Sequence, residues 1–360
     1  MLVANIFDIA IEKRASDIHL RTGLQPILRI DGRLTRLADQ PVLTHDDVMQ
    51  IFDQITNPDQ KKTFFTKKEL DFAYTHGTRA RFRINVMWQQ KTLSIACRHL
   101  PFVIPSIDEL ELPQVCKELI MQPRGLILVT GPTGVGKSTT MAAMIRHLNE
   151  NRDCNVICIE DPIEYQHQNI KSIIAQREVG DDTDSFHTAL VRAMRHDPDV
   201  LVVGEMRDLD TISAAITAAE TGHLVMSTLH TADAVQTIDR IIDVFPPAQQ
   251  AQIRLQLSQE LIAILSQTLL PRASGKGQIA VFEIVLPNTS IRTLIREGRE
   301  HEIPTYMKIH ADANVQTLDD ALVFMVHTNK ITRDAAMRKS SDPKRLLKML
   351  SEPMQQKVSL

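Results

Sequence analysis

One short segment constrains the fold of this chain more than any other. Residues 131–139 have the sequence Gly-Pro-Thr-Gly-Val-Gly-Lys-Ser-Thr and follow the apolar run Leu126-Ile127-Leu128-Val129. The pattern G-x-x-x-x-G-K-S between a strand and a helix is that of a phosphate-binding loop, whose glycines let successive N–H groups point at phosphate oxygens. The sequence therefore predicts an α/β protein that binds a nucleotide, with a strand at 126–130 and a helix at 138–148.

Each polar position in this loop has an expected role. Lys137 would carry positive charge to the β- and γ-phosphates, and the Ser138 hydroxyl would bind Mg²⁺. The N-terminal end of the following helix adds a favourable dipole for the same phosphates. The candidate nucleotide-binding residues are Gly131, Pro132, Thr133, Gly134, Val135, Gly136, Lys137, Ser138 and Thr139.

Charge and apolar patterning exclude several classes of partner. The 360 residues hold 41 Lys plus Arg against 44 Asp plus Glu, a net charge of −3, so no overall basic field attracts nucleic acid. No apolar stretch reaches the roughly 18 residues of a membrane span. The first residues lack the basic flank and cleavage site of a signal peptide. We therefore expect a cytoplasmic protein that binds no nucleic acid.

The cysteines do not form a recognisable framework. Cys97, Cys116, Cys154 and Cys158 show no C-x-x-C spacing, which argues against disulfides and against a zinc ribbon. A metal site at Cys154 and Cys158 would lack a second pair of ligands. All four are interpreted as reduced packing residues.

The hydrophobic periodicity divides the chain into four regions. Residues 1–99 contain short alternating runs, an Asp31-Gly32 turn and two helical stretches near 44–55 and 58–65, which indicates a small α+β domain. Residues 100–113 contain three prolines and indicate a linker, where we place the hinge. Residues 114–287 alternate apolar strands with helices, which predicts a mostly parallel sheet covered on both faces and a RecA-like arrangement. Residues 288–360 are predicted to be a helical C-terminal region.

Acidic residues follow two of the predicted core strands. The strand at 155–160 ends in Glu160 and continues through Asp-Pro-Ile to Glu164, and the strand at 200–203 is followed by Gly204 and Glu205. Ligands of open α/β sheets bind beyond the carboxyl ends of the strands. Glu160 or Glu164 is the candidate base that orients or deprotonates the attacking water, and Glu205 matches the Walker B position that contacts Mg²⁺ or its water.

Histidines and arginines supply further candidates. His223 and His230 flank the predicted strand at 224–228, so that one or both could sense a γ-phosphate, although a structural role is an alternative for each. Arg192 and Arg195 are predicted to lie on one helix face, and arginine suits a phosphate reached across a subunit boundary. The candidates for such trans contacts are Arg81, Arg83, Arg98, Arg192, Arg195, Arg207 and Arg240.

Together these motifs resemble one family. The phosphate loop, the acidic segments at 159–165 and 203–208, Gln-Arg-Glu-Val at 176–179, Ala-Ala-Glu-Thr-Gly-His at 218–223 and Ser-Thr-Leu-His-Thr at 227–231 closely resemble the type II/IV secretion ATPase superfamily. Within it the chain is similar to the branch that retracts type IV pili, from about residue 16 to about residue 294.

The resemblance implies a homohexameric ring with ATP and Mg²⁺ at the subunit joints and a PAS-like first domain. It implies that Lys137, Glu160, Glu164, Glu205 and His230 act in hydrolysis. It also implies that the ring lies at the cytoplasmic side of the inner membrane, drives a platform protein there, and acts indirectly on pilins for twitching motility.

Three observations favour retraction over assembly within the superfamily. Residues 271–279 form a short segment without the four-cysteine module usual in assembly and secretion ATPases, and the chain begins close to its first domain. Residues 290–294, Ser-Ile-Arg-Thr-Leu, resemble the Ala-Ile-Arg-Asn-Leu motif of retraction motors, with two changes. The alternatives are an assembly or secretion motor, a nucleotide-gated scaffold that does not hydrolyse ATP, and a DNA translocase, which would need a basic channel.

Overall fold

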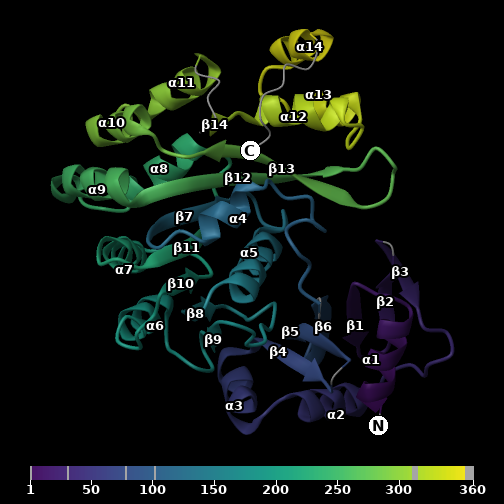
Figure 1. Ribbon diagram of the computed structural model, residues 1–360. Coiled ribbons are helices and arrows are strands. Elements are labelled where there is room, and N and C mark those ends of the chain that lie inside the picture. The colour runs from purple at the N-terminus through teal and green to yellow at the C-terminus, as the bar shows by residue number, and fades with distance from the viewer. Residues whose placement is uncertain (1, 31, 78, 101–102, 310–314, 353–360) are drawn as a thin grey trace. The chain divides into compact units, whose positions relative to one another are not determined.

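Two β-sheets of different kinds organise the chain, each inside its own unit (Figure 1). The computed structural model describes residues 2–30, 32–77, 79–100, 103–309 and 315–352. The first unit comprises Met1–Val103 with Pro162–Gln166, and the second comprises Ile104–Asp161 with His167–Leu360. A short segment of the chain therefore returns to the first unit from the middle of the second.

The first unit is an antiparallel sheet with three helices. Its elements are α1 (Leu2–Glu12), β1 (Asp17–Arg21), β2 (Ile27–Ile30), β3 (Arg33–Arg36), α2 (His45–Ile55), α3 (Pro58–Lys67), β4 (Glu69–His76), β5 (Ala80–Gln89) and β6 (Thr92–Leu100). Among the described residues six strands lie in the order β3-β2-β1-β6-β5-β4, and all neighbours are antiparallel. The predicted α+β character of this region is confirmed.

Local sequence signals explain where these elements begin. Thr44 forms a capping box with Asp47 at the start of α2, and Ile18 and Leu20 in β1 are buried because alternate residues face one side of a sheet. The predicted helices near 44–55 and 58–65 are confirmed, and the short alternating runs form strands. Asp31 of the predicted turn lies outside the described residues, and β2 and β3 on either side of it pair antiparallel.

The second unit is a mostly parallel sheet between helices. Its elements are α4 (Val115–Ile120), β7 (Gly125–Thr130), α5 (Lys137–Asn151), β8 (Asn155–Glu160), β9 (Ile173–Glu178), α6 (Phe186–Ala193), β10 (Val200–Val203), α7 (Leu209–Glu220), β11 (Leu224–Leu229), α8 (Ala234–Asp243), α9 (Pro247–Glu260), β12 (Leu261–Pro271), β13 (Gln278–Val285), α10 (Thr289–Glu297), the 3₁₀ helix η1 (Glu300–Glu302), α11 (Ile303–Ile309), β14 (Val315–Gln316), α12 (Leu318–His327), α13 (Arg333–Lys339) and α14 (Pro343–Ser351). The strand order is β14-β13-β12-β7-β11-β10-β8-β9. β12 through β9 run parallel, while β13 and β14 are antiparallel.

Apolar residues on alternate positions of the strands build a core on each face. Leu126 and Leu128 of β7 pack with residues of α6 to α11, whereas Ile127 and Val129 pack with α4 and α5. Figure 1 shows α6 and α7 on one side of the sheet and α5 on the other. The predicted α/β fold with a mostly parallel sheet covered on both faces is confirmed.

One local prediction needs revision. Arg192 and Arg195 do not share a helix, because α6 ends at Ala193 and Arg195 lies in the following turn. Pro198 and a left-handed Asp197, with φ 51°, explain why the helix stops there.

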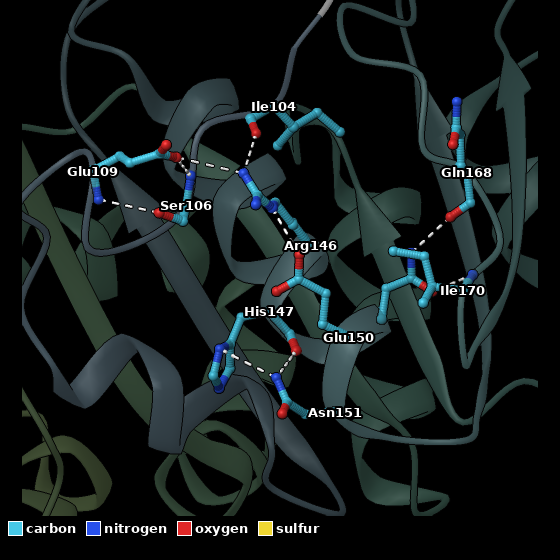
Figure 2. Close-up of polar contacts among 10 residues, drawn as sticks. Ile104, Ser106, Glu109, Arg146, His147, Glu150, Asn151, Gln168 and Ile170 are labelled. Carbon is cyan, nitrogen blue, oxygen red and sulfur yellow. Dashed lines mark hydrogen bonds and ion pairs between the residues drawn. The ribbon is translucent and has the colours of Figure 1, made fainter.

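The segment predicted as a linker contains ordered contacts. Within 100–113, residues 104–113 belong to the second unit, and Ile107 and Leu112 are buried in its core. Figure 2 shows Arg146 of α5 donating to the Ile104 carbonyl oxygen at 2.7 Å. Ser106 and Glu109 bond reciprocally, with the Ser106 N–H donating to Glu109 at 2.6 Å and the Glu109 N–H donating to the Ser106 hydroxyl at 3.1 Å.

Candidate functional site

The phosphate loop joins β7 to α5, as its sequence predicts. Gly131 has φ 140°, and a Cβ there would lie 2.4 Å from the Gln267 carbonyl oxygen, so only glycine fits against β12. The Gln267 amide group braces the loop from the same strand, because Nε2 donates to the Val135 carbonyl at 2.6 Å and Oε1 accepts from Thr140 at 2.8 Å. The loop is therefore shaped by a strand far along the chain.

Lys137 is the buried cation of the loop. Its side chain is only 8% exposed, and Nζ donates to the carbonyl oxygens of Gly131 at 2.6 Å and Pro132 at 3.1 Å. Lys137 is the first residue of α5, so the ammonium and the N-terminal end of that helix lie together. Ser138 follows at the exposed start of the helix. Positive charge and N–H donors at one place suit a phosphate group.

His230 connects this loop to the acid that follows β10. His230 Nδ1 lies 3.4 Å from Lys137 Nζ and 3.4 Å from Thr133 Oγ1, and Nε2 lies 3.4 Å from Glu205 Oε2. Glu205 also pairs with Arg207, whose Nε lies 2.6 Å from Oε1. The structure thus brings together Lys137, His230, Glu205 and Arg207 at the carboxyl ends of three neighbouring parallel strands.

Gly204 forms the turn between strand β10 and Glu205. Its N–H donates to the Ile159 carbonyl oxygen at 2.8 Å, and a Cβ would lie 3.2 Å from that oxygen. Glu205 is therefore the second residue after Val203, the last paired residue of β10, and lies just beyond the end of that strand. The Thr228 hydroxyl donates to the Gly204 carbonyl at 2.6 Å, which links this turn to β11 as well.

The two histidines that look equivalent in the sequence lie at opposite edges of the sheet. His223 precedes β11 and His230 follows it, and six strand residues span about 20 Å. His223 Nδ1 lies 2.9 Å from the Ala218 carbonyl at the end of α7. His223 therefore lies away from the phosphate loop of its own chain, and a role for it in sensing phosphate stays a prediction.

The acids of the other strand divide between the two units. Glu160 ends β8, and its Oε1 accepts from Gln176 Nε2 at 2.8 Å on the neighbouring strand β9. Glu164 belongs to Pro162–Gln166, the segment that folds with the first unit. The choice of base between Glu160 and Glu164 stays a prediction.

The candidate arginines are spread over both units. Arg83 pairs with Asp71 at 2.7 Å and Arg98 with Asp17 at 3.1 Å, while Arg81 is 8% exposed, all within the first unit. Arg195 lies between α6 and the start of β10, at the edge of the sheet opposite the phosphate loop. Arg192 lies in the last turn of α6 and Arg240 in the last turn of α8. A role in trans stays a prediction for each.

Sequence reasoning missed Gln267 and Glu283. Gln267 lies in the polar run Ser-Gln-Thr inside the apolar strand β12, a signal that could have drawn attention to it. Glu283 on β13 accepts from the Ala234 N–H, the first residue of α8, at 2.9 Å. Burial raises the pKa of Glu283 to about 7 and Asp233 adds to the rise, while the Ala234 bond opposes it. Nothing in its local sequence indicates this environment.

Two absences apply to the described part of the chain. There, no three His, Cys, Asp or Glu side chains cluster in a way that could hold a metal ion. None of the helices in that part combines the length and apolar character needed to cross a membrane. Burial raises the pKa of the Cys116 thiol to about 12 and holds that of Cys158 well above its usual value, so neither thiol ionises near neutral pH.

The mostly parallel sheet and the phosphate-binding loop define an α/β nucleotide-binding protein. Comparison with known proteins identifies its family. The family model of the type II/IV secretion system protein matches residues 1–321, and the chain belongs to this family. It is 42% identical over 343 residues to the type IV pilus retraction ATPase PilT of Pseudomonas aeruginosa, covering 95% of this chain and 99% of the relative. It is 41% identical to a twitching motility protein of Neisseria gonorrhoeae, covering 88% and 84%.

A solved structure gives the same result. The chain is similar to the crystal structure of the pilus retraction motor PilT with bound ADP, at a TM-score of 0.89 and 45% sequence identity. The match covers 96% of this chain and 98% of that one. The predicted superfamily is thereby confirmed.

Proposed function

We propose that this protein is a Mg²⁺-dependent ATPase that powers retraction of type IV pili as a homohexameric ring. The observation that carries the proposal is the contact series from Lys137 through His230 to Glu205, because it joins a phosphate-binding cation to a metal-binding acid across three strands. The likeness to PilT over nearly the whole of both chains supports the cellular role.

The side chains at the loop fit the groups that hydrolysis requires. The Ser138 hydroxyl and the Glu205 carboxylate are oxygen donors, the kind that Mg²⁺ prefers, and they would hold the ion directly or through its water. When bound, Mg²⁺ neutralises charge on the phosphates. Glu205 pairs with Arg207 and His230 through separate oxygens, so its carboxylate is held in place before any ligand arrives.

We assign the remaining steps to residues of this chain. Lys137 binds the phosphates in exchange for its two carbonyl partners, and the loop N–H groups orient them. Glu160 or Glu164 orients the attacking water and takes its proton. His230 lies between Lys137 and Glu205, so loss of the γ-phosphate changes its neighbours and moves the segment that follows it. Arginines from an adjacent subunit complete the charge around the phosphates.

The proposed setting is the cytoplasmic face of the inner membrane. There the ring would act on a platform protein, and through it on pilins. The connection between β12 and β13 runs only from Arg272 to Gly277 and holds no cysteine, which favours retraction over the assembly motors that carry a four-cysteine module.

Two experiments test the proposal. Mg²⁺-ATPase activity per milligram should rise with protein concentration, because sites shared between subunits need assembly. A chain that binds ATP and never hydrolyses it would instead be a nucleotide-gated scaffold. In cells, deletion should leave surface pili and abolish twitching movement. Loss of the pili themselves would indicate an assembly motor.

A further inference from the structure

The segment that carries His230 has a second attachment outside the site. Residues 230–233 connect β11 to α8, so the position of the first residue of α8 limits where the His230 ring can lie. That first residue is Ala234, and its N–H donates to Glu283 Oε1 at 2.9 Å. Glu283 therefore holds the far end of a very short connection.

Glu283 is itself linked in register to the strand that leads into the phosphate loop. It lies opposite Ser266 on β12, and the Ser266 hydroxyl accepts from Thr130 Oγ1 at 3.1 Å. Thr130 is the last residue of β7 before Gly131. The strands β7, β12 and β13 thus form a fixed base between the phosphate loop and the start of α8.

We propose that Glu283 is a positioning residue that holds the His230 segment against the phosphate loop. The inference rests on the proposed ATPase function and adds a residue that lies outside the reacting groups. Two contacts of Thr237 also hold residues 231–233 against the first turn of α8. The Thr231 and Thr237 hydroxyls lie 2.7 Å apart, and Thr237 donates to the Asp233 carbonyl at 2.7 Å. Through the Ala234 N–H, Glu283 links this turn to strand β13.

Charge makes this attachment responsive to pH. An ionised carboxylate accepts a stronger hydrogen bond than a protonated one, and a helix N-terminus favours its negative charge. The pKa of Glu283 is raised to about 7 by burial, so ionisation near neutral pH strengthens the bond to Ala234. Glu283 lines a cavity of about 560 Å³, and the charged or titratable groups that also line it are Asp233, His301, Lys308, Asp319, Lys339 and Arg345.

Two substitutions separate the acceptor from its charge. Glu283→Gln keeps a neutral oxygen that can accept from Ala234, whereas Glu283→Ala removes the acceptor. Asp47→Ala is the matched control, because the Asp47 carboxylate likewise accepts a backbone N–H, that of Thr44 at 2.8 Å, at the start of α2 in the first unit. All three are made in the full chain, with circular dichroism as the check of folding.

Hydrogen exchange without nucleotide tests the attachment directly. In Glu283→Ala, amides of peptides covering 230–237 should exchange about fivefold faster than in the wild type, as expected for the loss of one buried hydrogen bond. Glu283→Gln should remain close to the wild type at pH 6, where the wild-type carboxyl is mostly protonated. Asp47→Ala should leave these peptides unchanged.

Turnover tests the positioning. In Glu283→Ala we expect kcat to fall about tenfold with the KM for ATP within about twofold, because a displaced group costs rate more than binding. Between pH 6 and 8 the wild-type kcat should rise through a step near pH 7 that Glu283→Gln lacks. Rescue of kcat by glutamine at pH 6 but not by alanine would support positioning over packing.

Clear results would overturn the inference. Wild-type exchange and kcat in Glu283→Ala, or equal losses in the alanine, glutamine and control variants, would each do so. Should Glu283→Ala fail to fold, Glu283→Gln decides alone, through the presence or absence of the step near pH 7. If the wild type hydrolyses no ATP, the proposed function fails, while the exchange experiment still decides whether Glu283 holds the segment.

Discussion

Two groups of charged residues in this protein are held in opposite ways. Lys137, His230 and Glu205 contact one another across three neighbouring strands of one unit. Arg83 and Arg98 of the other unit pair instead with Asp71 and Asp17 within their own antiparallel sheet. The first group is complete as a contact series inside one chain. The arginines are local surface pairs, so any part they take in hydrolysis depends on assembly.

The largest effect is expected when the cation of the first group, Lys137, is removed. Lys137→Ala should lower ATP turnover at least about a hundredfold, because a preorganised charge in a partly buried loop stabilises the transferred phosphate. Steady-state phosphate release from the assembled ring is the measurement, and Lys117→Ala, at an ion pair with Asp108, is the control. Normal turnover in Lys137→Ala would refute the role of the loop.

A smaller effect separates binding from hydrolysis. Glu205→Ala should bind ATP nearly as well as the wild type, since the loop and Lys137 remain, and should turn over roughly tenfold to a hundredfold more slowly. Binding is measured with a fluorescent ATP analogue and turnover by phosphate release. Weak binding with normal turnover would contradict the assignment of Glu205.

Mixed rings sharpen the comparison for the arginines. Arg83→Ala subunits mixed with Lys137→Ala subunits should recover part of the lost activity if Arg83 acts on a neighbour's nucleotide, because some joints then contain one intact residue of each kind. Arg79→Ala is the matched control, since Arg79 pairs with Asp8 in the same unit. Absence of recovery at every mixing ratio would leave Arg83 with its local pair alone.

The smallest effect concerns stability. Burial raises the pKa of Asp17, but hydrogen bonds from Ser16 and Arg98 and the nearby arginine charges outweigh it and leave that pKa lowered. A lowered folded-state pKa contributes stability above the unfolded value of about 4 and loses it as pH falls. Because Arg98 is 72% exposed, Arg98→Ala should cost only about 0.5 kcal/mol at pH 7.

Urea unfolding at several pH values measures this cost. The difference between wild type and Arg98→Ala should shrink below about pH 4 and vanish once Asp17 is protonated in both. A difference that persists at pH 2 would assign the loss to packing of the arginine stem instead.

Local signals predicted the elements that depend on neighbouring residues in the chain. The phosphate loop, the Thr44 cap and the strand at 155–160 each follow from a few adjacent residues. The roles of Gln267 and Glu283 did not follow, because they arise only once β12 lies beside β7 and β13 beside β12. Gln267 follows Val135, the loop residue to which it donates, by 132 residues. A sequence pattern therefore specifies a helix or strand more readily than it specifies which other elements pack beside it.

Direction along the sheet explains the remaining differences. His223 and His230 bracket one strand symmetrically in the sequence, yet a parallel sheet binds ligands at a single edge, so only His230 meets the loop. Arg195 was assigned to a helix whose end was set by a left-handed residue before a proline. The residues that end a helix give only a weak signal in the sequence, yet they decide whether two side chains lie on the same helix.

The helix that follows the phosphate loop, α5, forms hydrogen bonds to both segments that connect the second unit to the first. Arg146 donates to the Ile104 carbonyl just after the first crossing (Figure 2). Asn149 donates to the Gln168 carbonyl and accepts from the Ile170 N–H after the chain returns. α5 has 15 residues and is about 22 Å long. A displacement of either segment therefore acts on the same helix that begins at Lys137, the cation of the phosphate loop.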